Sequence, residues 1–348
     1  MSKRNQGIEL LRLVLMFMVC MLHILGQGGL LNMYTLESFE CKVLLLFETV
    51  AFCAVDSFAI ISGYVASNKP TKYSRLIELW FQVLFYSCIL NLFFRIAGLA
   101  DKYDKEDFIV LLFPVTSDTY WYFTAYFSAF IFFPLIKKFV FELDEKAAKK
   151  WLIVLFIIFT IVDMNYNLFM LNGGYSLIWI MLLYMFGALA KKSNLFAEKK
   201  TSVLVLILVV CSIITWLLYV TTGISSLLTY TSPTILLNGM ILVIVFSRIQ
   251  LKGNVIGKIS PLAFGIYLFQ LNPVIWDNLE DAVIKLASSK ILIVILQFIG
   301  LSLVLFILGL IVDLIRKKLF DLLHIHRFSE LLEQALRIIL SKCIKVLR

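Results

Sequence analysis

The sequence IELLRLVLMFMVCMLHILGQ, residues 8–27, decides the fold because it is long and apolar enough to cross a bilayer as a helix. Its strongly polar side chains are those of Glu9, Arg12 and His23. Glu9 lies at the edge of the segment, where it can reach interfacial water. Arg12 and His23 lie inside it, where an ionisable group costs several kcal/mol unless it faces a partner or a water-filled cavity. The segment therefore predicts a membrane helix with two polar groups in its interior.

The spacing of Arg12 and His23 places both on one face of that helix. They are eleven residues apart, so helix geometry separates them by about 20° around the axis and roughly 16 Å along it. One interpretation is a functional pair that lines a polar path. The other is that the two groups only find partners inside a helix bundle, which makes their burial tolerable. Two ionisable groups on one face favour the functional interpretation.

The composition excludes a soluble globular protein. Of the 348 residues, 61% are hydrophobic and 16% are charged, and the mean hydropathy is +0.93, which is too little charge for a soluble surface. Six cysteines without paired spacing predict neither a disulfide framework nor a zinc site. The first span is too long for a signal-peptide core and should be retained. We expect an all-α, polytopic membrane helix bundle in the cell membrane, with no nucleic-acid partner.

A window of about 20 residues predicts about ten membrane-spanning helices. They lie near residues 8–27, 43–66, 76–97, 120–140, 151–171, 173–190, 203–221, 232–250, 259–278 and 291–315. Lysine and arginine gather in alternate loops, whereas the other loops are mainly acidic. Cytoplasmic loops retain positive charge, so both termini are expected in the cytoplasm. The alternation supports ten spans, since one missed helix would invert every later loop.

Two regions follow from this pattern, a membrane domain of residues 1–315 and a cytoplasmic, amphipathic, basic tail of residues 316–348. In the tail, apolar residues recur at helical period with basic residues between them. We expect it to lie on membrane lipid, held partly by anionic headgroups. His324 and His326 have no third ligand nearby in the sequence, so we expect surface residues there and no metal site.

Depth in the bilayer suggests two side-chain pairs between the first and second spans. If these spans are antiparallel neighbours, Glu48 lies near the level of His23 and Asp56 near the level of Arg12. A carboxylate beside the imidazole would raise its basicity, as a general base requires. We therefore predict that Glu48 assists His23 in catalysis. Either pair can instead serve only to settle buried charge, and for Arg12 with Asp56 that is the favoured interpretation.

Four motifs follow one another along the chain. They are the pair Arg12 and His23, AVDSFAIISGY at residues 54–64 with Arg75 beyond it, YWYF at residues 120–123, and FGIYLF at residues 264–269. In this order they resemble the motifs of the acyltransferase-3 superfamily of integral membrane acyltransferases. The resemblance implies transfer of an acyl group, usually acetyl, from cytoplasmic acyl-CoA to a hydroxyl of a surface glycan or lipid-linked sugar. It also implies that His23 is the catalytic residue. Acyl-CoA is then a donor substrate, and no bound cofactor is expected.

The residues can be given roles that fit such a reaction. Guanidinium groups suit the phosphates of CoA, so Arg75 and Arg12 are the candidate donor-binding residues. Tyr267 and Gln270 are candidates to steady an oxyanion. The candidate acceptor contacts are Asp56, Trp121 and Tyr122, with Tyr126 as a further ring on which a sugar can stack. Aromatic belts at membrane interfaces offer a plain alternative for these rings.

The chain departs from the family pattern in two places. Many relatives have His after the Tyr-Leu pair of the late motif, whereas this chain has Phe269 and Gln270, so no acid or base is expected there. No extracytoplasmic hydrolase-like domain follows the last span, which favours direct transfer to the acceptor.

Two other classes of protein compete with the acyltransferase. A transporter or flippase of a lipid-linked saccharide would use Arg12, His23, Glu48 and Arg95 to line a substrate path. It predicts inverted repeats and broken spans, of which the sequence offers no convincing sign. A glycan polymerase would need a larger external loop than residues 98–119. The acyltransferase is therefore the favoured function.

Overall fold

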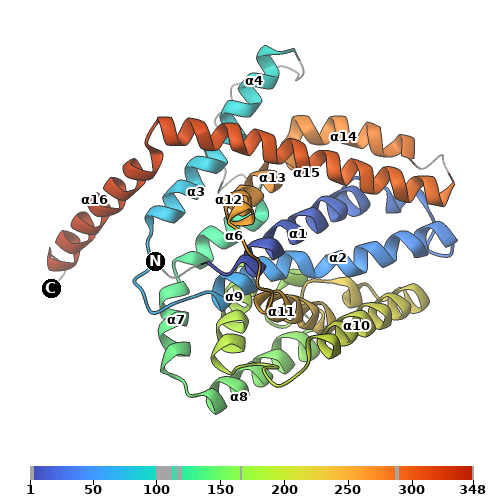
Figure 1. Ribbon diagram of the computed structural model, residues 1–348, viewed down its shortest axis with the longest axis horizontal. Coiled ribbons are helices and arrows are strands. Elements are labelled where there is room, and N and C mark those ends of the chain that lie inside the picture. Colours follow the sequence, from blue (N-terminus) through green and yellow to red (C-terminus); the bar gives the residue numbers. More distant parts are fainter. Residues whose placement is uncertain are drawn as a thin grey trace.

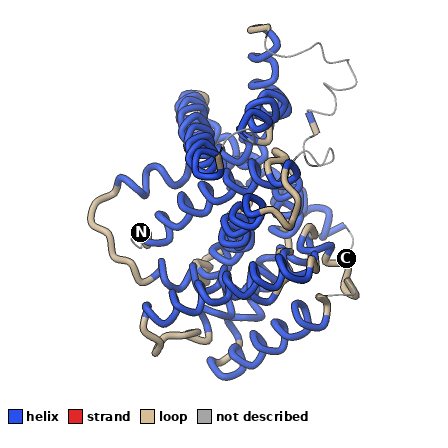
Figure 2. The backbone as a smooth tube through the Cα atoms, turned by 90° about the vertical axis from the view of Figure 1, so that its right-hand side faces the viewer, coloured by secondary structure: helices blue, strands red, loops and turns tan. Residues whose placement is uncertain are grey.

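The computed structural model describes residues 4–98, 112–113, 115, 120–164, 167–286 and 290–346. Most of the expected external loop at residues 98–119 lies outside them. Within the described residues every regular element is a helix, which confirms the all-α class. Figure 1 shows a bundle whose long helices run roughly parallel or antiparallel to one another, and Figure 2 shows the same arrangement from the side.

Six helical segments in the described part of the chain are long and apolar enough to cross a membrane. Three of them are single helices: Phe39–Tyr64 (α2), Thr201–Thr222 (α10) and Ile291–Leu322 (α15). The other three are composite: Gln6–Met33 contains α1 (Gln6–Leu22), and Ser225–Ser247 contains α11 (Pro233–Ser247). Ser74–Ile96 begins with α3 (Ser74–Leu84) and ends with α4 (Asn91–Ile96). Two bent pairs raise the number to eight if each pair is one span. They are α6 (Trp121–Phe130) with α7 (Phe133–Glu142), bent by 57°, and Val255–Gln270, which ends with α13 (Ala263–Gln270), with α14 (Pro273–Leu286), bent by 72°.

The expected number of about ten spans is thus not confirmed. The spans expected at residues 151–171 and 173–190 correspond to shorter helices. The first is α8 (Glu145–Phe156), whose opening turns carry charged residues, continued by a π-helix, and the second is α9 (Leu177–Lys192), of only 16 residues. A helix of that length rises about 24 Å, less than the hydrocarbon core of a typical bilayer.

The helices α2 and α9 make the closest contact of the bundle core. A Cβ added to Gly63 would lie 1.8 Å from the carbonyl oxygen of Tyr184, and one added to Gly187 would lie 2.0 Å from that of Ile60. Only glycine therefore fits at either position, and the two main chains meet directly. This contact fixes α9 against the helix that follows the first span.

The bundle has two chemically different ends. At the left of Figure 1 lie the start of α3, the turn between α7 and α8, and α16 (Ile325–Val346). Lysine and arginine gather at this end, for example at Lys137, Lys138, Lys191 and Lys192, so we call it the basic end. The far end, at the right of Figure 1, holds the start of α2, the end of α10 and the start of α15.

The last span does not stop at residue 315, because α15 continues to Leu322 before α16 begins.

The tail is attached to the bundle by charged side chains. Glu333 of α16 accepts a 2.8 Å hydrogen bond from the backbone N–H of Ser74 and so caps α3. Partial burial opposes ionisation of Glu333, but hydrogen bonds from Arg337 and Ser74 outweigh it and lower its pKa to about 2. Glu333 therefore stays charged at physiological pH.

A second contact between α16 and α3 should depend on pH. His326 hydrogen-bonds to Glu78, and this bond, with the charge of Glu78, raises the pKa of His326. Because the pKa of His326 is raised when α16 is docked, protonated His326 stabilises docking below the unfolded-state pKa of about 6.5. This contribution is lost as pH rises through the folded-state pKa. We expect the protection of amides at the start of α3, measured relative to their intrinsic base-catalysed exchange rates, to fall over that range.

The control for this prediction is Glu78→Gln, which should remove the pH dependence of this protection. His324→Asn, which changes the neighbouring histidine, should leave it unchanged. The same pH dependence in Glu78→Gln as in the unaltered chain would show that another group controls docking.

Candidate active site

His23 lies where the first helix changes its geometry. The α-helix gives way to a π-helix over His23–Gln27, and such segments inside α-helices occur frequently at functional sites. The side chain is only 9% exposed. Because the carbonyl of His23 accepts a 2.6 Å hydrogen bond from the N–H of Gly28, the backbone around it is well fixed. The imidazole is therefore presented at a defined position inside the bundle.

The imidazole is surrounded by residues of α13 and α14. Its ring centre lies 6.4 Å from that of Tyr267 and 6.1 Å from that of Trp276, and the side chain of Gln270 interacts with it. Within the described residues, Nδ1 of His23 and Oε1 of Gln270 have no hydrogen-bond partner. Buried polar atoms are seldom left unsatisfied, so this place can offer hydrogen bonds to a substrate.

The sequence analysis missed Trp276. It lies just beyond the break between α13 and α14, where the ninth expected span was treated as a continuous helix. The dipeptide Asn272-Pro273 inside that apolar segment was the available signal, because it favours a turn. The search for broken spans also missed the bent pair α6 and α7.

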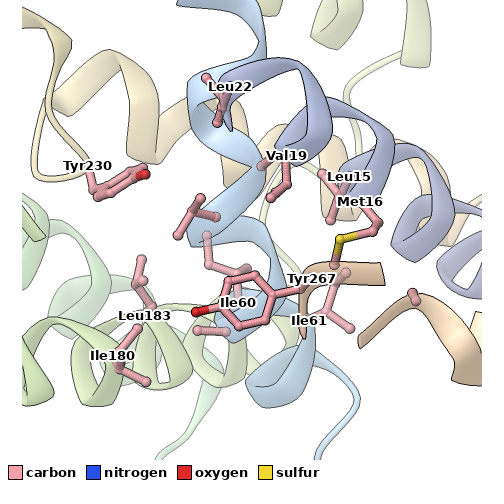
Figure 3. Close-up of a cluster of buried hydrophobic side chains, with 14 of the residues drawn as sticks. Leu15, Met16, Val19, Leu22, Ile60, Ile61, Ile180, Leu183, Tyr230 and Tyr267 are labelled. Carbon is pink, nitrogen blue, oxygen red and sulfur yellow. The ribbon is translucent and has the colours of Figure 1, made fainter. Parts of the chain in front are cut away.

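A row of aromatic rings leads from His23 towards the basic end. The ring centres of Tyr267 and Tyr122 are 6.4 Å apart. Those of Tyr122 and Tyr126 are 6.2 Å apart, and these two rings are nearly parallel. The hydroxyl of Tyr126 is 3.2 Å from that of Ser62. Figure 3 shows Tyr267 amid buried apolar side chains, between Met16 and Leu183. We call Tyr267, Tyr122 and Tyr126 the aromatic row; Tyr122 and Tyr126 are half-buried.

The two candidate donor-binding arginines flank the basic end of this row. Arg12 and Arg75 both lie within electrostatic range of the Tyr126 hydroxyl. Arg75 is exposed in the first turn of α3, whereas Arg12 is half-buried. The Nε atom of Arg12 has no hydrogen-bond partner in the described part of the chain. The structure thus brings Arg12, Arg75 and Tyr126 into one region.

The expected pair of Arg12 with Asp56 does not form. Asp56 is fully buried, and its Oδ1 accepts a 3.0 Å hydrogen bond from Nε1 of Trp179. Its Oδ2 has no partner among the described residues. The carboxylate faces α9, because the rotation of α2 turns it away from Arg12. A role of Asp56 in binding substrate stays a prediction.

Glu48 lies beside the π-helix without bonding to His23. Its Oε1 would be 3.5 Å from a Cβ placed on Gly26, so it reaches the helix one turn beyond the imidazole. Among the described residues, no hydrogen bond or ion pair joins it to His23. The catalytic role of Glu48 stays a prediction.

Trp121 lies beside the aromatic row, with its ring centre 5.5 Å from that of Tyr122, and it also packs against rings outside the row. The centre of its ring lies 4.5 Å from the ring centre of Tyr175 and 6.0 Å from that of Tyr230. Tyr230 in turn packs 4.7 Å from Phe52. Much of the Trp121 ring is therefore already covered by the protein.

The described residues include no group of three or more His, Cys, Asp and Glu side chains that could hold a metal ion. His324 and His326 lie at the start of the tail, and His326 is occupied by Glu78.

A buried charged cluster near the basic end was also missed. Asp313 is fully buried and accepts hydrogen bonds from Arg316 at 2.9 and 2.6 Å, from Gln82 at 2.9 Å and from Tyr86 at 3.0 Å. A Cβ on Gly265 would lie 2.1 Å from Oδ1 of Asp313. This cluster ties α3, α13 and α15 together, and α13 carries Tyr267 and Gln270. The opposite charges at positions 313 and 316, one helical turn apart, were its signal.

Comparison with known proteins supports a single family. Neither the curated proteins nor the solved structures give a match. A family model described as an acyltransferase domain matches residues 5–314. That range covers almost the whole chain and includes His23, the aromatic row and Asp313. The chain is therefore a member of the acyltransferase-3 family.

Proposed function

We propose that this membrane acyltransferase transfers an acyl group, most simply acetyl, from acyl-CoA to a hydroxyl of a surface glycan or lipid-linked sugar. The observation that carries the proposal is the aromatic row, which joins the arginines near the basic end to His23. A polyanionic donor with a thin arm suits that layout, since guanidinium groups bind phosphate and aromatic rings can flank the arm.

The direction of transfer follows from the charge of the two ends. Positively charged loops are retained in the cytoplasm, so we assign the basic end and both termini to that side of the cell membrane. Acyl-CoA is a cytoplasmic metabolite and would enter between Arg75 and Arg12. The acceptor would then reach His23 from the far end.

His23 can serve this reaction in two ways. As a general base, it takes the proton of the acceptor hydroxyl while the oxygen attacks the thioester carbonyl. The C–S bond then breaks, and the CoA thiolate leaves with the proton from the imidazolium. Alternatively, an imidazole nitrogen attacks the thioester carbonyl first, the C–S bond breaks and CoA leaves with the imidazole proton. The acceptor hydroxyl then attacks the acyl-imidazole, and its proton returns to the imidazole as the acyl group is transferred. Gln270 and Tyr267 lie beside the ring, where they would steady the oxyanion of either path.

The direct test uses inverted membrane vesicles supplied with radiolabelled acetyl-CoA. We expect label in a polysaccharide or lipid-linked saccharide fraction. Label found only in acetyl-CoA and free acetate would reject the proposal. Membership of an acyltransferase family favours this enzyme over a saccharide carrier, which would move its cargo without acquiring label.

Replacing Arg75 by alanine should chiefly weaken donor binding. A hydrogen bond to a charged group contributes about 1.5 kcal/mol, so we expect the KM for acetyl-CoA to rise roughly tenfold with little change in kcat. The measurement is initial rate against acetyl-CoA concentration in vesicles. Lys138→Ala is the matched control, because it removes an exposed positive charge from the same end. Unchanged donor dependence in Arg75→Ala would place the phosphates elsewhere.

A further inference from the structure

The helix α14 starts at a firmly anchored break beside His23. Asn272 is fully buried, donates from Nδ2 to the carbonyl of Tyr86 at 3.1 Å, and accepts from the N–H of Val274 at 3.1 Å. The chain bends by 72° here. Broken helices inside a membrane protein are tolerated where they are buried in protein or line a cavity, and they often form binding sites. The anchoring gives α14 a fixed direction relative to the imidazole.

Trp276 is the residue of α14 that touches His23. The two rings lie at 89° to one another with centres 6.1 Å apart. The indole is only half-buried, so part of it remains open next to the imidazole. A molecule that lies against this open part would therefore be held beside His23.

Glu280 lies one turn further along the same side of α14. Leu279 and Val283 are buried and turn towards the bundle, whereas Glu280 is exposed. Residues four apart on a helix are neighbours on its surface, so Glu280 lies next to Trp276 on the more exposed side. Figure 1 shows α14 running from α13 towards the far end, alongside α15.

We propose that Trp276 and Glu280 form the binding surface for the acceptor sugar. This inference rests on the proposed function and names the acceptor side of the same site. An aromatic ring offers an apolar face to the C–H side of a sugar, and a carboxylate accepts hydrogen bonds from its hydroxyls. The sugar would stack on the indole and place one hydroxyl at His23.

Two other features agree with a sugar at α14. Trp121, one of the three aromatic residues that the sequence suggested for sugar stacking, already packs against Tyr175 and Tyr230. The acidic residues Glu280 and Asp281 are exposed on α14, and their charge disfavours an anionic lipid headgroup at this surface. A neutral sugar is not repelled by these carboxylates, and it can stack on Trp276 instead of on the covered ring of Trp121.

The experiment compares two rates in inverted vesicles with radiolabelled acetyl-CoA. Release of CoA measures total turnover, including transfer to water, and label in the saccharide fraction measures transfer to the acceptor. We expect Trp276→Leu to lower the label transferred per CoA released by about tenfold, and Glu280→Gln by about threefold. The KM for acetyl-CoA should stay the same in both variants.

Matched variants separate acceptor binding from folding. Asp281→Asn neutralises the next exposed carboxylate and should leave the ratio unchanged. Trp276→Phe keeps an aromatic face and should recover most of the transfer, even if Trp276→Leu folds poorly.

Two outcomes would overturn the inference. If CoA release and label fall in equal proportion in Trp276→Leu and Trp276→Phe, the indole only supports His23. If neither quantity changes, the acceptor binds elsewhere. Absence of saccharide label in the unaltered protein would instead reject the proposed function, and that result requires no variant.

Discussion

Replacing His23 by alanine is expected to abolish acyl transfer while the protein still inserts into the membrane. A positioned general base contributes about 10²- to 10⁴-fold to the rate, and a nucleophilic role would make the loss complete. The side chain is buried without a hydrogen bond to Nδ1 within the described residues, so its removal breaks no hydrogen bond at that atom. The assay is transfer of label from acetyl-CoA to the saccharide fraction, normalised to the amount of folded protein in the membrane.

The other histidines of the chain provide the control. His324 has a left-handed backbone with φ of 53°, which asparagine accepts better than most residues, so His324→Asn should keep full activity. Transfer at more than a tenth of the normal rate in His23→Ala would remove His23 from the reaction.

Replacing Gly265 by alanine is expected to destabilise the protein more than any other glycine-to-alanine change in the last third of the bundle. The added Cβ would fall 2.1 Å from Oδ1 of Asp313, so α13 or the carboxylate must move. Separation of Asp313 from Arg316, Gln82 and Tyr86 would leave buried charge uncompensated, which costs about 3 to 5 kcal/mol. We expect the Tm in detergent to fall by roughly 5 to 10 °C.

Gly300→Ala on α15 is the matched control. An added Cβ meets no atom within 4 Å there, and alanine favours a helix over glycine by about 1 kcal/mol. Its Tm should stay the same or rise slightly. Thermal unfolding followed by fluorescence-detected size-exclusion chromatography measures both variants. Equal Tm values for the two would show that the Asp313 cluster adapts to the extra methyl group.

The parts of the fold that the sequence predicted depend on local signals. Hydrophobic length identifies α1, α2 and α15 without knowledge of their neighbours, and the spacing of Arg12 and His23 places them on one face. Helix depth also placed Glu48 beside that helix, where it lies near Gly26. The family resemblance rested on the order of short motifs, and the match over residues 5–314 confirms it.

The parts that were missed depend on how helices rotate and break. Depth places Asp56 near the level of Arg12, but rotation of α2 directs its carboxylate to Trp179. Trp276 reaches His23 only because the chain bends at Asn272. The charges at positions 313 and 316 indicate a local pair, but the other partners of Asp313, Gln82 of α3 and Tyr86 just beyond it, lie more than two hundred residues away, and no local pattern indicates those contacts.

The direct meeting of α2 and α9 also has a consequence for how relatives of this chain can vary. At Gly63 and Gly187 the obstructing atoms belong to the main chain of the other helix, so no substitution at a neighbouring side chain can make room. Each position should therefore remain glycine through evolution, whatever acceptor the relative uses. If Trp276 and Glu280 bind the acceptor as we propose, they should instead change together when the acceptor changes. A comparison of these four positions in an alignment of the family would separate residues that preserve the fold from residues that adapt the enzyme to its acceptor.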